Sequence, residues 1–177
     1  GDVTTHVAPQ DDADAEETVE DLVEAATVRD EVALNDRVVV QVEATGLYGT
    51  MAAQSGEDDN GFAIKEDGTT AETLGDVSDL AGEGIEFTLE AGAGTGNQQP
   101  AELNYDNADK SEVFVLVDED GGQFFVIADT DASDAWSNGD PEDGESYTAS
   151  LEYTTDDDNL YQFDNDNPFS GAAEGTE

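Results

Sequence analysis

The sequence predicts an all-β protein, folded as an antiparallel β-sandwich, and three observations support this fold class. Short apolar runs rich in β-branched and aromatic residues recur along the chain, separated by Gly, Asp and Asn. These runs do not alternate with long helical segments, so a parallel βαβ sheet is not expected. The third observation is a central pair of apolar runs, Val113–Val117 and Phe124–Ala128, joined by an acidic turn.

The central pair of runs is predicted to form a hairpin. Its turn contains Asp120-Gly121, which supplies the positive φ that a tight turn needs. Neither run alternates with polar residues, so we expect both faces of the hairpin to be covered. The hairpin is therefore expected in the middle of a sandwich or barrel rather than at a sheet edge.

The N-terminal region is predicted to contain two pieces. Residues 1–10 are extended, with Val3, Thr5 and Val7 alternating against polar neighbours. This piece either pairs within its own sheet or adds, through these three residues, to the sheet edge of an adjacent copy. Residues 11–29 are acidic with apolar residues at helical spacing, which is compatible with a helix or with a solvated linker.

The body of the chain holds the remaining predicted strands. They cover residues 37–43, 62–64, 85–89, 101–105, 147–153 and 159–163. Short helical turns are expected around residues 47–53 and 70–82, and an acidic loop that holds Trp136 is expected at residues 129–144. The predicted division is an N-terminal segment at 1–29, a β-sandwich domain at 30–169 and a tail at 170–177.

Acidic residues dominate the composition. The 177 residues include 46 Asp and Glu against 4 Lys and Arg, a formal net charge of −42. Self-repulsion at this charge density destabilises a compact state unless salt screens it, and the Debye length falls from about 8 Å in physiological salt to about 3 Å at 1 M. We therefore interpret the chain as a halophile's protein that attracts cations. The same charge excludes nucleic acids and anionic membrane surfaces as partners.

Few residues offer catalytic chemistry. The chain has no cysteine, and His6 is its only histidine, so thiolate or histidine-based zinc sites and Ser-His-Asp arrangements are not expected. With 46 acids, any two carboxylates can meet by chance, so an acidic hydrolase is the weakest alternative. We accordingly expect no enzyme, no catalytic residue and no required cofactor.

Calcium is the one inorganic ligand that the composition favours, because hard cations prefer several carboxylate and carbonyl oxygens. Two acidic stretches are candidate sites, the first with Asp129, Asp131 and Asp134 and the second with Asp164 and Asp166. The first stretch departs from an EF-hand loop, which needs Gly at its sixth position and Glu at its twelfth. An acidic turn without a bound ion is the competing interpretation of both stretches.

Four stretches follow one another in a characteristic order. They are Arg29–Gly49 (RDEVALNDRVVVQVEATGLYG), 85–89, 115–131 and 147–153. In this order they resemble a domain that recurs in haloarchaeal cell-surface glycoproteins, often as Ig-like modules of S-layer-like proteins. The resemblance implies an exported, surface-located, Ig-like β-sandwich with no known catalytic residues. The chain departs from such glycoproteins because it contains no Asn-x-Ser/Thr acceptor for N-glycosylation.

Composition and resemblance together lead to a functional expectation. The chain is expected to be an extracellular structural protein of a halophilic archaeon, a β-sandwich subunit or module of a surface layer, stalk or filament. Its partners would then be copies of itself or neighbouring surface-protein domains. The alternative is an adhesion module that binds carbohydrate or calcium.

Overall fold

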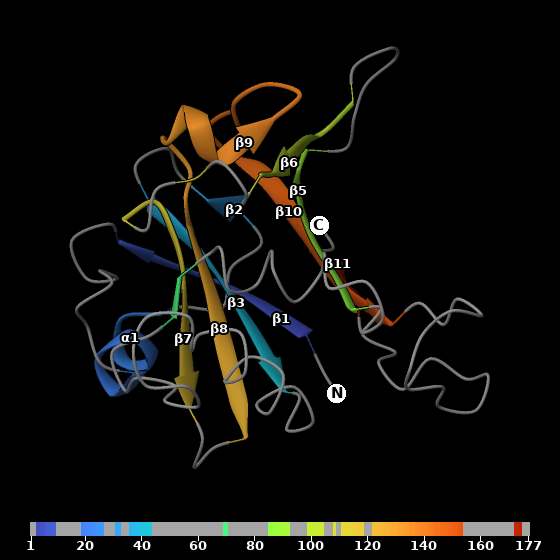
Figure 1. Cartoon of the computed structure of the whole chain (residues 1–177). Coiled ribbons are helices and arrows are strands. Elements are labelled where there is room, and N and C mark those ends of the chain that lie inside the picture. The colour runs from blue at the N-terminus through green and yellow to red at the C-terminus, as the bar shows by residue number, and fades with distance from the viewer. Residues whose placement is uncertain are drawn as a thin grey trace, which may run out of the picture.

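The structure is a computed structural model of the chain, and it describes residues 3–9, 19–26, 31–32, 36–43, 69–70, 85–92, 99–104, 108, 111–118, 122–153 and 172–174. In these residues the chain consists mostly of antiparallel strands, which form two sheets (Figure 1). The prediction of an all-β, antiparallel protein is confirmed at this level.

Five strands form the first sheet, which we call sheet I. Their order is β1-β3-β8-β7-β4, and each neighbouring pair is antiparallel. The bounds are Val3–Pro9 for β1, Asp36–Glu43 for β3, Thr69–Thr70 for β4, Val113–Asp118 for β7 and Gln123–Asp129 for β8. The hairpin β7–β8 lies inside this sheet, between β3 and β4, which confirms the position predicted from its apolar sequence.

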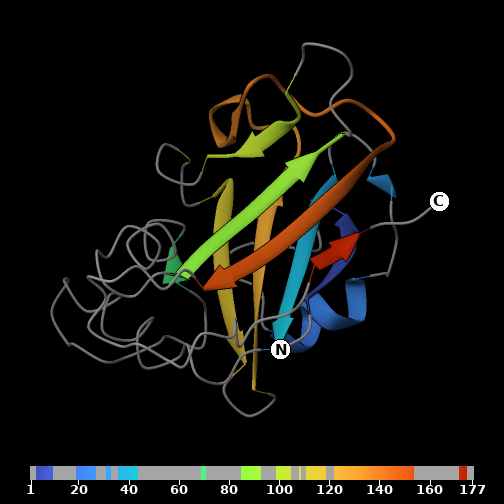
Figure 2. The same cartoon turned by 90° about the vertical axis from the view of Figure 1, so that its right-hand side faces the viewer.

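Six strands form the second sheet, sheet II. Its path is β11-β10-β5-β6-β9, and β2 pairs with β10 off this path. The bounds are Glu31–Val32 for β2, Ile85–Ala91 for β5, Ala101–Leu103 for β6, Trp136–Ser137 for β9, Glu145–Tyr153 for β10 and Ala172–Glu174 for β11. In Figure 2, β5 and β10 run diagonally in front of the strands of sheet I.

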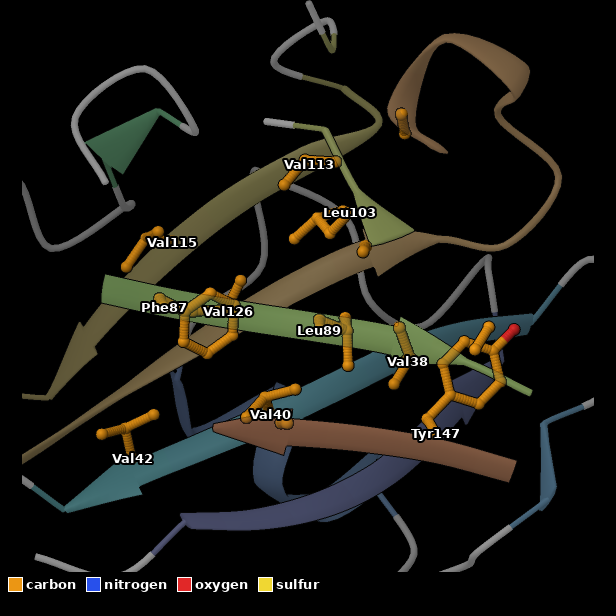
Figure 3. Packing of buried hydrophobic residues seen from close by; sticks show 14 of the residues in the cluster. Val38, Val40, Val42, Phe87, Leu89, Leu103, Val113, Val115, Val126 and Tyr147 are labelled. Atoms are coloured by element: carbon orange, nitrogen blue, oxygen red, sulfur yellow. The ribbon is translucent and has the colours of Figure 1, made fainter. Parts of the chain in front are cut away.

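The inner faces of the two sheets share one apolar core (Figure 3). Side chains alternate between the two faces of a strand, so every second residue of β3, β7 and β8 points into this core. Sheet I contributes mainly valines, such as Val40 and Val126, and sheet II contributes larger side chains. Among them, Phe87, Leu89 and Tyr147 are each at most 1% exposed.

The outer face of sheet I carries a second apolar cluster, and helix α1 (Val19–Ala25) packs against it. Leu22 of α1 is fully buried in this cluster. The strand residues of the cluster are Ala8, Val39, Phe114, Leu116, Phe125 and Ile127. In Figure 1, α1 lies on the side of sheet I that faces away from β5 and β10. The two clusters explain why β7 and β8 are apolar at successive positions.

Most of the predicted elements that fall on described residues are present. The helix alternative for residues 11–29 is confirmed over residues 19–25, where α1 lies, and β3, β5, β6 and β10 correspond to four predicted strands of the body. Residue 70 pairs with β7 as part of β4 instead of starting a helical turn. The predicted elements at 47–53, 62–64 and 159–163 lie outside the described residues.

Two segments that were predicted to be irregular contain regular structure. Within the acidic loop, residues 133–135 form the 3-10 helix η3 (Ser133–Ala135), and β9 follows it directly. Within the tail, β11 pairs with β10. Both short strands obtain their hydrogen bonds from partners far away in the sequence, β6 and β10, and local composition does not reveal such partners.

Candidate functional site

The first predicted calcium site lies at the turn that follows β8. Asp129 is 7% exposed, and its Oδ1 accepts a hydrogen bond from the backbone N–H of Asp131 at 3.0 Å. This carboxylate therefore holds the shape of the turn, whereas Asp131 and Asp134 are exposed. Among the described residues, no group of three or more His, Asp or Glu side chains is placed to hold a metal ion. Asp164 and Asp166 lie outside those residues.

Trp136 connects this turn to the core. Its Nε1–H donates to the backbone oxygen of Asp129 at 2.9 Å, and its ring meets the ring of Tyr147 edge to face, with 5.9 Å between the ring centroids. Burial raises the pKa of the Tyr147 phenol, and the charge of Glu145 raises it further. The expected acidic loop is thus fixed to the core by an aromatic pair, while several of its acids face solvent.

Arg37 is the one Lys or Arg side chain in the part of the chain that the structure describes, and it is buried. Its Nη1 donates to the backbone oxygen of Ser111 at 3.0 Å, and its guanidinium carbon lies 5.3 Å from the ring centroid of Phe114. In the strand register, Arg37 is the Cα partner of Asp129. The buried guanidinium therefore stabilises the outer face of sheet I through its hydrogen bond and its contact with the aromatic ring.

A row of polar side chains crosses the outer face of sheet I. His6 Nε2 lies 2.8 Å from Gln41 Oε1, and Gln41 Nε2 donates to Gln123 Oε1 at 2.5 Å. Gln123 Nε2 in turn donates to Asp118 Oδ2 at 2.8 Å. We call these four residues the polar ladder. An ionised carboxylate only accepts, so Asp118 orients the Gln123 amide, Gln123 orients Gln41, and His6 Nε2 carries the proton that it donates.

The polar ladder joins four strands, because its members come from β1, β3, β8 and β7. Each of its hydrogen bonds connects one strand of sheet I with the next. Sequence reasoning missed this feature and also missed the burial of Arg37. The local signal is weak: a polar residue interrupts or borders an apolar strand in each case, but its partner is set by the register between distant segments.

Hydroxyl and carboxylate groups line the outer face of sheet II. Thr88 Oγ1 and Ser150 Oγ lie 2.6 Å apart, and the hydroxyl of Ser137 donates to the backbone oxygen of Glu102 at 3.1 Å. Glu90 and Glu102 are Cα partners on the neighbouring strands β5 and β6. This face is therefore suited to strong hydration and to attracting cations, rather than to packing against an apolar partner.

The three residues predicted to serve assembly lie in β1. This strand pairs with β3 of its own sheet along its whole length, with Val3 opposite Val42 at one end. Val7 is buried in the shared core, and Val3 packs against that core. The hydroxyl of Thr5 is buried and has no hydrogen-bond partner in the described residues. Addition of this segment to an adjacent copy stays a prediction.

No protein-family model, curated protein or solved structure matches this chain. In the described residues, no helix has the length and the apolar character needed to cross a membrane. The functional assignment therefore depends on the charge and the geometry of the chain's own residues.

Proposed function

We propose that this chain is an extracellular structural protein of a halophilic archaeon, an Ig-like β-sandwich that serves as a subunit or module of a surface layer, stalk or filament. This role involves no catalytic step and requires no cofactor. The observation that carries the proposal is the separation of charge in the fold: most of the described acids occupy exposed positions of strands and turns, whereas the one described Lys or Arg side chain is buried.

The exposed acids are spread over both sheets, α1 and the turns. They include Asp21, Glu24, Glu43, Glu102, Asp131, Asp134, Asp140, Glu142, Asp143 and Glu152. A surface of this kind repels itself, and dissolved ions at molar concentration reduce that repulsion to a range of about 3 Å. This physical requirement supports a halophilic source.

The packing of the strands supports the sandwich class and the structural role. The two sheets share one continuous apolar core, as the layers of a sandwich do. The polar ladder adds hydrogen bonds across four strands of one layer. A module held by both a shared apolar core and hydrogen bonds across its strands resists deformation, which suits a building block of a cell surface.

Electron microscopy and light scattering of the purified chain in molar NaCl test the proposed role. Ordered sheets or filaments are the expected product, and antibodies against the chain should label intact cells. A particle that remains monomeric over a wide concentration range with its β-structure intact would argue against a building block. If that monomer also binds a glycan, the role is adhesion instead.

A further inference from the structure

We propose that sheet II is the salt-sensitive part of this molecule, and that its strands separate before those of sheet I when salt is withdrawn. The proposal concerns the folding of the chain and does not depend on a role at the cell surface. It follows from the residues that the strand register places opposite one another. Like charges directly opposite on neighbouring strands destabilise a sheet, whereas opposite charges and hydrogen-bonding partners stabilise it.

Two pairs of glutamates are Cα partners in sheet II. Glu90 of β5 is opposite Glu102 of β6, and Glu86 of β5 is opposite Glu152 of β10. The chain neighbours of Glu90 and Glu102 point into the shared core, so these two side chains extend from the outer face. In a directly opposite pair such as Glu90 and Glu102, the two Cβ atoms lie about 5 Å apart. That separation is shorter than the Debye length of about 8 Å in physiological salt and longer than the value of about 3 Å at 1 M.

The register of sheet I contains no such pair among its described strands. Each carboxylate there is opposite a neutral residue or a cation. Asp36 is opposite Pro9, Glu43 and Asp118 are opposite Gln123, and Asp129 is opposite Arg37. The polar ladder adds a hydrogen bond to one of these pairs, and α1 covers the apolar centre of the same face. Lowering the salt concentration therefore weakens the strand pairing of sheet I less than that of sheet II.

Within the described residues, no Lys or Arg side chain reduces the repulsion between the paired glutamates. The one Lys or Arg side chain there, Arg37, is buried on the outer face of sheet I, and the shared core separates that face from sheet II. Dissolved cations at molar concentration screen such surface pairs. The strength of the β5–β6 and β5–β10 pairings is thus coupled directly to ionic strength.

A double-mutant cycle on Glu90 and Glu102 tests this coupling. The variants E90Q, E102Q and E90Q/E102Q are unfolded with urea, which adds no ionic strength. The measurements are made at about 1 M NaCl and at the lowest salt at which the wild-type chain keeps its β-structure. At the lower salt, each single change is expected to raise the folding equilibrium constant about two- to five-fold. The double variant gains little more, because the first change already removes the repulsion.

E43Q is the matched control for E102Q. Glu43 is also an exposed glutamate on a strand, but its Cα partner Gln123 is uncharged. Both changes alter the net charge by one unit, so any difference between them reports the partner. A smaller effect for E43Q supports the proposal. Equal effects, or a cycle without coupling at the lower salt, overturn it.

Hydrogen exchange read by mass spectrometry tests the order in which the sheets open. As salt is lowered, amides of β5, β6 and β10 are expected to lose protection several-fold more than amides of β3, β7 and β8. E90Q/E102Q should restore much of the protection in sheet II. Parallel loss in both sheets, or earlier loss in sheet I, contradicts the proposal.

Discussion

Among the described residues, Tyr147 is the one whose pKa departs clearly from its ordinary value. Burial, and then the charge of Glu145, raises the pKa of its phenol above the ordinary value. The native state therefore keeps this proton at a pH where the unfolded chain, with a tyrosine pKa of about 10, releases it. The contribution of this phenol to the free energy of unfolding is therefore constant below about pH 10. Above that pH the free energy of unfolding falls, by up to about 1.4 kcal/mol per pH unit.

Substitution of Tyr147 by Phe is expected to abolish this alkaline loss of stability. The measurement is the free energy of unfolding in urea at several pH values from neutral to alkaline, at constant molar salt. W136F is the control, because Trp136 packs against the Tyr147 ring but does not titrate. W136F should lower stability at every pH by about 1 kcal/mol, through loss of the hydrogen bond to Asp129, and should keep the alkaline slope. An unchanged slope in Y147F would contradict the assignment.

At the scale of single elements, the polar ladder determines how firmly β1 is held at the edge of sheet I. Q41L removes the hydrogen bonds to His6 and to Gln123 together and is expected to cost roughly 1–2 kcal/mol of stability. Amides of β1 should then exchange faster, because β1 has β3 as its paired neighbour. Urea unfolding and hydrogen exchange in molar salt measure the two effects.

Q41E is the matched control for the ladder. A glutamate at residue 41 can still accept a hydrogen bond from the His6 N–H, but it cannot donate one to Gln123. Its effect on the β1 amides should therefore be smaller than that of Q41L, while the contact between β3 and β8 is lost in both variants. Equal protection of β1 in all three proteins would show that the side-chain hydrogen bonds do not hold the strand.

At the scale of the whole molecule, the net charge of −42 opposes the compact state. Circular dichroism is expected to show loss of β-structure as NaCl is lowered from about 1 M to about 0.1 M, because the Debye length grows from about 3 Å to about 10 Å. KCl should protect as well as NaCl at equal ionic strength. Sucrose strengthens apolar burial without screening charge and should protect less. A titration without a transition would contradict a halophilic protein.

Much of the fold could be predicted from local patterns. The apolar runs at β7 and β8 predicted a hairpin covered on both faces, and the apolar patterns at 85–89 and 147–153 predicted the strands β5 and β10. The helix alternative for the acidic N-terminal region follows from apolar spacing, and Leu22 is the residue that this spacing buries. These predictions succeed because burial of one face leaves a period in the sequence.

The sequence by itself determined the all-β class, the main strands and the excess of negative charge, since each depends on composition or on the pattern of neighbouring residues. Only the tertiary structure decided which strands pair, and with what register. That register places Glu90 opposite Glu102, joins Gln41 to Gln123, and buries Arg37 against Phe114. Each of these pairs brings together residues from different strands. Such contacts are set by the fit of two sheets around a common core, which no local pattern specifies.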